Sequence, residues 1–234
     1  MNVLAFDTCF GAVSAAVRWQ DGHGAWLLRE AYEPRTTGHA ERLFPMIAEV
    51  MEGAGLVFSA IDRIAVTLGP GTFTGVRVGV ASARAFALAT GKPVVAMTSL
   101  AVMAHRAEQL LGAARGGRRM VVAVDARRGM VYAQLFGDSG VETNEALLLA
   151  PEEAAHAIGR EPALIVGSAA PAVAAAVTAA GGKAEARLPD LQPHACTLAV
   201  VAPELAPTDP VKPLYLRLPD AKAQGNALFP RSRP

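Results

Sequence analysis

Few charges, few cysteines and no long hydrophobic run characterise the sequence. Of its 234 residues 18% are charged, less than the quarter usual in soluble proteins, and the net charge is +1. This near-neutral charge argues against a protein that binds nucleic acid alone through a broad basic surface. Cys9 and Cys196 are too few for a disulfide framework, and neither belongs to a CxxC pair.

The sequence also lacks the features of export and of membrane insertion. Met1 leads directly into a strand-like run, without the basic flank and long apolar stretch of a signal peptide. No apolar run approaches the ~20 residues that span a bilayer. We therefore expect a reduced, cytoplasmic protein. A chain of 234 residues suffices for one large domain or for two small ones that share a cleft.

What the sequence does contain is a regular order of strands and helices. The first half predicts strands at residues 3–6, 12–19 and 26–32, a helix at 38–53, a strand at 64–68, a helix at 74–90, a strand at 94–97 and a helix at 98–111. Pro45 falls inside the first helix, so that helix either bends there or begins its regular part there. Three strands followed by alternating helices and strands resemble a ribonuclease-H-like unit.

The second half repeats the opening of the first. Residues 3–7 form an apolar run that ends in Asp7, and residues 121–125 form one that ends in Asp125. In both copies three residues then precede a glycine, and valine and alanine follow at alternate positions. The same spacing in the same context favours duplication over chance. We therefore predict an α/β fold with a duplicated ribonuclease-H-like (actin-like ATPase) architecture, in which two subdomains flank a cleft.

The boundary between the subdomains is expected at the glycine pair 116–117. This predicts an N-terminal subdomain at residues 1–115, a smaller C-terminal subdomain at 116–225 and a disordered tail at 226–234. The periodic signal is weaker in the second half. It predicts a helix at 151–158, a strand at 164–166 and helices at 170–180 and 196–205.

Two features of the sequence are suited to binding phosphate groups. Asp7 and Asp125 each end a strand at a tight turn, where backbone N–H groups can hold phosphates and a carboxylate can hold magnesium through water. Residues 69–79, GPGTFTGVRVG, form a glycine-rich turn that leads into a helix start, a natural anion site that is not a Walker loop. The alternatives stay open: the aspartates cap turns, and the glycines permit a tight turn and close helix packing.

As a string, the glycine-rich segment resembles the signature of the TsaB family, Gly-Pro-Gly-Ser/Thr-Phe-Thr-Gly-Val/Leu-Arg-Ile/Val-Gly. Further matches follow in order along the chain: Asp7-Thr8, His39 with Leu43 and Pro45, Pro93 to Val95 with Ser99 and Leu100, Val124 to Arg127 with Val131 and Tyr132, and Pro213 to Arg217. The resemblance spans nearly the whole chain and is strongest before Tyr132. Cys9 and Ala40 replace serines that are common in the family, which weakens a phosphate-binding role at these two positions.

The resemblance implies a duplicated actin-like fold and a role as non-catalytic scaffold or activator in a complex with the paralogue TsaD and the ATPase TsaE. Together these proteins transfer a threonylcarbamoyl group from its adenylate to N6 of adenosine 37 in tRNAs that read ANN codons. The chain would then contact tRNA only through the complex, would not be an enzyme on its own and would need no cofactor. A degenerate nucleotide site would consist of Asp7, Thr8, Gly69, Gly71, Thr72 and Asp125.

The resemblance also predicts that no metal is bound. TsaD carries a His-x-x-x-His metal motif just after the strand that follows its own Gly-Pro-Gly helix, and two histidines four apart reach one metal from one helical face. The matching places here hold Ser99 and Met103, and His105 has no histidine four residues away on either side. The remaining histidines form no closely spaced ligand pair; they are His23, His39, His156 and His194.

A rival interpretation is a small actin-fold phosphotransferase or weak ATPase. Such kinases usually carry an adenosine-binding loop with paired glycines in the second half, and the candidate loop here has only Gly167. Nucleotide affinity is therefore expected to be weak or absent, and a thermal shift with magnesium-ATP discriminates between the two functions. A stand-alone tRNA-binding module is disfavoured by the near-neutral charge.

Two helices predict a partner surface. In the first, at residues 39–51, Met46 and Met51 lie off the main apolar stripe, and in the second, at 74–90, small residues let another helix approach closely. The family implies that TsaB pairs with TsaD through these helices and that the free chain forms a homodimer through the same face. The predicted interface residues are Phe44, Met46, Met51, Gly79, Ala81 and Ala85. In the alternative, both helices lie under other parts of the same chain.

Overall fold

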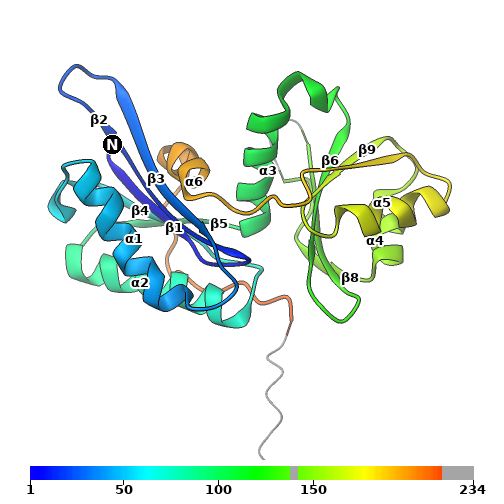
Figure 1. The fold of residues 1–234 in the computed structure, drawn as a ribbon, viewed down its shortest axis with the longest axis horizontal. Coiled ribbons are helices and arrows are strands. Elements are labelled where there is room, and N and C mark those ends of the chain that lie inside the picture. Colours follow the sequence, from blue (N-terminus) through cyan, green and yellow to red (C-terminus); the bar gives the residue numbers. More distant parts are fainter. Residues whose placement is uncertain (138–141, 218–234) are drawn as a thin grey trace, which may run out of the picture.

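Two five-stranded mixed sheets with the same strand order organise the molecule (Figure 1). The computed structural model describes residues 1–137 and 142–217. The first sheet has the order β3-β2-β1-β4-β5, and the second has the order β10-β9-β6-β7-β8. Taken from its opposite edge, the second sheet reads β8-β7-β6-β9-β10, so every strand of the first has a counterpart at the same place. This topology confirms the predicted duplicated α/β fold.

The first half contains the eight predicted elements with ends shifted by at most two residues. They are β1 (Val3–Asp7), β2 (Ala12–Gln20), β3 (Trp26–Pro34), α1 (His39–Gly53), β4 (Arg63–Thr67), α2 (Phe73–Thr90), β5 (Val94–Met97) and α3 (Ser99–Leu111). Strand β1 is antiparallel to β2 and parallel to β4, as the meander followed by helical crossovers requires. The Thr98 side chain caps α3 by accepting a hydrogen bond from the Ala101 N–H at 3.0 Å.

The second half contains two strands that the sequence did not predict. Its elements are β6 (Arg119–Asp125), β7 (Val131–Phe136), β8 (Leu147–Leu149), α4 (Pro151–Ile158), β9 (Ala163–Val166), α5 (Ala170–Ala179), β10 (Ala184–Arg187) and α6 (Ala195–Val201). The unpredicted strands, β8 and β10, are the two short edges of the sheet. The helix predicted at 196–205 is shorter than expected, because the chain passes into a 3-10 turn at Ala202–Glu204 around Pro203.

Helices α1 and α2 are the longest regular elements of the first half. α1 begins at His39, so of the two alternatives for Pro45 the one in which the regular part of the helix starts there is excluded, and Pro45 lies inside the helix. α2 extends over 18 residues and ends at Gly91, which has the left-handed conformation of a helix C-cap. Within residues 1–137 and 142–217, no helix combines the length and the apolar character needed to cross a membrane.

The inner strands β1 and β4 of the first sheet are buried on both faces, which explains their continuous apolar sequences. In β1 the side chains of Leu4 and Phe6 pack with α1 and α2, whereas Val3 and Ala5 pack with α3 and α6. One face of the second sheet is covered by α4 and α5. Its other face packs against α3, which therefore lies between the two sheets (Figure 1).

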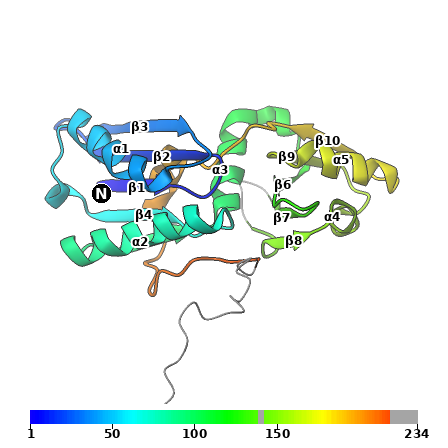
Figure 2. The same ribbon diagram turned by 60° about the horizontal axis from the view of Figure 1, so that its bottom comes forward.

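The chain returns to the first sheet after completing the second. The Ala195 N–H donates to the Ser14 hydroxyl at 3.0 Å, and Arg63 donates to the carbonyl oxygen of Ala202 at 2.8 Å. Figure 2 shows the following segment, in orange, running below α2 toward the second half. Along this path the Leu214 N–H donates to the carbonyl oxygen of Leu68, the residue after β4 of the first half, at 2.7 Å. Residues 195–214 thus contact the first half, although the predicted boundaries assign them to a second subdomain.

The predicted division at 115/116 stays a prediction, and the predicted tail at 226–234 lies outside the described residues. Because residues 195–214 contact the first half, the second sheet lies between two segments of the chain that both pack on the first sheet.

Gly71 and Gly75 let the glycine-rich turn lie directly on the backbone of Thr8 and Cys9. A Cβ atom at Gly71 would overlap with the carbonyl oxygen of Cys9, and one at Gly75 with that of Thr8, both within the 3.0 Å that Cβ atoms essentially never enter. The Thr72 N–H donates to the Cys9 carbonyl oxygen at 2.7 Å. The Thr8 hydroxyl donates to the Gly75 carbonyl oxygen at 2.6 Å. These contacts support close packing as a reason for the glycines.

We expect Gly75→Ala to lower the free energy of unfolding by about 3 kcal/mol, because the added methyl group must displace backbone atoms rather than a flexible side chain. Urea denaturation followed by circular dichroism measures the loss. Gly22→Ala is the matched control, since nothing lies within 4 Å of a Cβ atom there. A Gly75→Ala protein as stable as the Gly22→Ala protein would contradict the packing role.

Candidate functional site

A cavity of about 550 Å³ lies between the two halves of the molecule. Its volume is in the range of small-molecule sites. The walls come from the entrance and first turn of α1 (36–41), the start of α2 (71–75), the β6–β7 turn (125–127) and the returning segment (214–217), with Phe10 and Tyr132. The rings of Phe10 and Tyr132 lie 6.3 Å apart and join the two halves here.

Two helix N-termini and two arginines make parts of this cavity electropositive. The first turns of α1 and α2 both line it, and their free N–H groups and dipoles favour anions. Arg127 comes from the β6–β7 turn, and Arg217 donates to the carbonyl oxygen of Ala126 at 2.8 Å. Asp125 and Glu41 also line the cavity. The arrangement suits a small polar ligand with an anionic group and hydrogen-bond donors.

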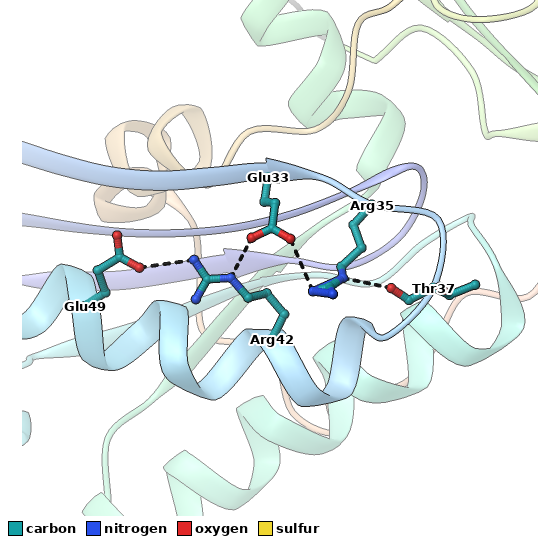
Figure 3. A network of polar contacts seen from close by, with 5 residues as sticks. All are labelled: Glu33, Arg35, Thr37, Arg42 and Glu49. Atoms are coloured by element: carbon teal, nitrogen blue, oxygen red, sulfur yellow. Dashed lines mark hydrogen bonds and ion pairs between the residues drawn. The ribbon is translucent and has the colours of Figure 1, made fainter.

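A network of ion pairs holds the loop at the entrance of α1 (Figure 3). Glu33, at the end of β3, accepts from Arg42 of α1 at 2.7 Å and pairs with Arg35 at 3.2 Å. Arg42 also pairs with Glu49 at 3.2 Å, and Arg35 donates to the Thr37 carbonyl oxygen at 2.9 Å. These contacts connect strand, loop and helix, and so position residues 36–38 at the cavity.

Asp7 does not face the cavity. Its carboxylate is buried and accepts hydrogen bonds from the Thr67 hydroxyl and from the Cys9 N–H, the latter at 3.3 Å. Burial raises the pKa of the Asp7 carboxyl from its ordinary value of 3.8 to about 6, although these hydrogen bonds lower it. The predicted pair of cleft carboxylates therefore needs correction, because Asp7 is enclosed in its own half.

Asp125 has a different environment, although it occupies the equivalent place in the second sheet. It is exposed, its own N–H donates to the Ser168 hydroxyl at 3.0 Å, and its carboxylate accepts from the Arg127 N–H at 2.8 Å. The last contact is the turn-capping role that was the alternative for this residue. Asp125 nonetheless lines the cavity.

The structure thus divides the six predicted nucleotide-binding residues into two groups. Gly71, Thr72 and Asp125 line the cavity. Asp7, Thr8 and Gly69 lie behind the wall, where Thr8 is buried and Gly69 packs on the Leu214 backbone with φ +103°. Nucleotide binding at the first group stays a prediction.

The raised pKa of Asp7 makes the free energy of unfolding depend on pH. Because the folded-state pKa of about 6 lies above the ordinary 3.8, the folded protein binds this proton more tightly than the unfolded chain, and ionisation of Asp7 destabilises the fold as pH rises through this window. Asp7→Asn removes that titration. We expect the stability of the variant relative to the wild type to increase by about 3 kcal/mol from pH 3.5 to pH 7.

Urea denaturation of both proteins across this range measures the difference. The comparison cancels the contributions of the other carboxylates, which are common to both proteins. A difference that stays constant with pH would mean that Asp7 titrates normally and is not enclosed.

The predicted partner residues on α1 and α2 also fall into two groups. Phe44 is 51% exposed, and Ala81 and Ala85 are exposed on α2. Met46, Met51 and Gly79 are buried inside the chain, so the prediction that they face a partner needs correction. In α1 the buried stripe is wider than expected and includes both methionines. In α2 a Cβ atom at Gly79 would meet the Thr8 hydroxyl at 2.9 Å.

An aromatic group extends the exposed part of this surface. The ring of Phe86 lies 5.6 Å from that of Phe44 and 5.4 Å from that of Phe58, which is 39% exposed. Leu88 at the end of α2 is 89% exposed. Exposed apolar groups of this kind are typical of surfaces that bind another protein.

Ser99 and Met103, which occupy the positions of the two histidines in the TsaD metal motif, lie in the core of the protein. Ser99 and Met103 are both buried, and the Ser99 hydroxyl donates to the carbonyl oxygen of Pro70 at 2.5 Å. Ser99 therefore connects α3 to the glycine-rich turn, and the side chain of Met103 packs in the core between the two sheets.

Sequence reasoning missed the arginines of the cavity. Arg127 and Arg217 both lie in segments that resemble the TsaB family, but nothing in their spacing places them together, since they are 90 residues apart. The entrance of α1 was also missed as part of the site. Only the fold brings these segments to one cavity.

Comparison with known proteins identifies relatives of the chain. Residues 33–196 match a family model described as TsaD, tRNA N6-adenosine threonylcarbamoyltransferase. The tRNA threonylcarbamoyladenosine biosynthesis protein TsaB of Escherichia coli is 35% identical over 132 residues, which are 56% of this chain and 53% of that protein. An uncharacterised protein of Mycobacterium leprae is 33% identical over 94% of this chain and 56% of its own length. The chain thus spans about half the length of these two curated relatives.

A solved structure shows the same fold along almost its whole length. YeaZ from Pseudomonas aeruginosa superimposes with a TM-score of 0.72 at 30% identity, over 92% of this chain and 99% of that one. A second structure from the same organism, described as similar to the peptidase YeaZ, has a TM-score of 0.74 at 30% identity.

Proposed function

Because this chain belongs to the TsaB/YeaZ family, whose named members act in tRNA threonylcarbamoyladenosine biosynthesis, we propose that it is the non-catalytic partner subunit of that reaction. In the proposed complex a TsaD-like protein holds the catalytic site and a TsaE-like ATPase acts with it in the cytoplasm. The complex adds threonylcarbamoyl to N6 of adenosine 37 in tRNAs that read ANN codons.

One observation carries the non-catalytic part of the proposal. The two places that match the metal-binding histidines of TsaD hold Ser99 and Met103, whose side chains are enclosed in the core. A hydroxyl that already donates to a carbonyl oxygen and a thioether with no access to solvent supply no imidazole nitrogen for a catalytic metal. The chemistry must then come from the partner.

The surface of the chain agrees with a role in protein assembly. The net charge of +1 gives no broad attraction for the phosphates of tRNA, so contact with tRNA is proposed to occur through the complex. The exposed face around Phe44, Ala81 and Ala85 combines an aromatic group with small side chains that permit close helix contact. We propose this face as the contact for the TsaD-like partner and, in the free chain, for a homodimer.

The phosphotransferase alternative has one observation in its favour, the cavity at the N-termini of α1 and α2, whose wall includes Arg127 and Arg217 beside Glu41 and Asp125. Against it, the Asp7 carboxylate that would hold magnesium through water is buried and bonded to Thr67 and Cys9. A Cβ atom at Gly167 would overlap with the Ala123 backbone, so this glycine serves packing rather than a nucleotide. The subunit role is therefore preferred.

We expect the purified chain to make no threonylcarbamoyladenosine from tRNA and the threonylcarbamoyl adenylate, because Ser99 and Met103 stand at the two places that match the metal-binding histidines of TsaD. Adding the TsaD-like and TsaE-like proteins of the same host with ATP restores synthesis, measured by nucleoside chromatography after nuclease digestion. The mixture without this chain is the control and stays inactive. Synthesis by this chain alone, or equal synthesis without it, would refute the proposed role.

A second prediction concerns the partner face. Ala81→Glu and Ala85→Glu should leave the circular dichroism spectrum unchanged, because both positions are exposed on α2. Each should weaken binding of the TsaD-like protein by a hundredfold or more, since an unpaired charge buried at an interface costs about 3 kcal/mol. The same variants should abolish any homodimer seen by sedimentation.

Ala175→Glu is the matched control, because Ala175 is exposed on α5 of the other half. It should bind the partner like the wild type. Wild-type affinity of Ala81→Glu and Ala85→Glu would place the interface elsewhere.

A further inference from the structure

Three side chains with metal-binding atoms meet where α6 packs on the edge of the first sheet. Glu30 lies in β3, His194 is the N-cap residue of α6, and Cys196 is in its first turn. One ligand atom from each lies within 4.8 Å of the other two. Glu30 and His194 are 164 positions apart in the chain, so a search for closely spaced ligands could not find this group.

The separations suit a small cation with tetrahedral coordination. The His194 Nδ1 atom lies 3.2 Å from the Glu30 Oε2 atom. Two such atoms bound tetrahedrally to zinc at ~2.0 Å lie about 3.3 Å apart, so this pair needs almost no movement. In a tetrahedral zinc site the Cys196 sulfur would lie about 3.5 Å from each of the other two ligand atoms. The three atoms now lie within 4.8 Å of one another, so the sulfur must approach the other two by at most about 1.3 Å.

The surrounding contacts hold two of these side chains in place. The ring of Tyr32 stacks on that of His194 with centroids 4.3 Å apart and planes 5° apart. The other carboxylate oxygen of Glu30 accepts the Cys196 N–H at 3.0 Å. Contacts that orient ligands in this way are typical of metal sites. His194 and Glu30 keep 18% and 19% of their side-chain surface exposed, so an ion and a water molecule can reach them.

The donor set selects the kind of metal. A thiolate, an imidazole nitrogen and one carboxylate oxygen suit zinc and related ions, whereas magnesium and calcium prefer oxygen donors alone. We propose that Glu30, His194 and Cys196 bind one Zn²⁺ ion, with water as the fourth ligand. This site is independent of the proposed function in tRNA modification.

Binding changes the protonation of the cysteine. Burial and the neighbouring Glu30 carboxylate raise the pKa of the Cys196 thiol to about 11, so the metal-free protein holds this thiol neutral. Zn²⁺ must displace the thiol proton, which is released to solvent as the Zn–S bond forms. The proton that His194 Nδ1 donates to Glu30 must leave as well, to solvent or to Nε2 of the same ring, before the Zn–N bond forms. The ion thereby replaces the thiol proton between sulfur and carboxylate and offsets the negative charge of both.

The consequence of such a site is a link between distant segments. β3 is the edge strand of the first sheet, and α6 is the helix with which the chain returns to that sheet. A metal held by both joins them across the 164 positions between Glu30 and His194. Zn²⁺ would thereby stabilise the packing of the returning segment on the first sheet.

The test uses the full chain, freed of metal by a chelator under reducing conditions. Zn²⁺ is titrated in competition with a chromophoric chelator, and Co²⁺ is used as a spectroscopic probe of ligation. We expect one Zn²⁺ per chain and a thiolate-to-cobalt charge-transfer band. Glu30→Gln, His194→Gln and Cys196→Ser should each weaken Zn²⁺ binding by at least ~100-fold, and Cys196→Ser should remove the band.

His156→Gln is the matched control, because His156 is an exposed histidine on α4, far from α6 in sequence and in the other half. It should bind Zn²⁺ like the wild type. Circular dichroism checks the fold of each variant, and Glu30→Gln supplies the decision if Cys196→Ser does not fold. Absence of stoichiometric Zn²⁺, absence of the charge-transfer band, or unchanged affinity in Glu30→Gln would overturn the proposal and leave an ordinary Glu30–His194 ion pair.

Discussion

The backbone contact between the glycine-rich turn and residues 8–9 is the constraint on which the first half depends. Because no side chain separates the two segments, helix α2 begins at a position set by the end of β1. That placement directs the N-terminus of α2 into the cavity and encloses Asp7 behind the turn. It also leaves the face with Ala81 and Ala85 in solvent. The cavity wall, the titration of a carboxylate and the proposed partner face thus share one origin.

Much of the fold could be predicted from the sequence, because its strands are buried and its helices end at recognisable residues. A strand covered on both faces reads as a continuous apolar run, as β1 and β6 do. Thr98 and Gly91 mark a helix start and a helix end by capping. The edge strand β10, AEAR, escaped prediction because it has no apolar run, unlike the buried four-residue strands β5 and β9. The three residues of β8 are too few to show a period, and both edge strands depend on the neighbouring strand for their conformation.

The site could be predicted only in part, because the environment of a residue comes from distant segments. Asp7 and Asp125 are equivalent in the repeat, yet Thr67 and the glycine-rich turn enclose only Asp7. Met46 and Met51 were expected at a partner surface, but packing of α1 on the sheet buries a wider stripe than a simple helical pattern indicates. Likewise, the cavity combines residues near 38, 72, 126 and 216, whose proximity no local pattern encodes.

The return of the chain to the first sheet has a mechanical consequence. The backbone passes between the halves after α3 and between β10 and α6 (Figure 1), and residues 214–217 extend once more from Leu68 of the first half to Ala126 of the second. The halves also share one hydrophobic core, which contains Phe10 of the first half and Met120 and Tyr132 of the second. Arg217 adds a further link, since it donates to the carbonyl oxygen of Ala126 and so connects the end of the returning segment to the β6–β7 turn. An occupant of the cavity would therefore contact segments whose relative positions are fixed by several connections and not by one linker.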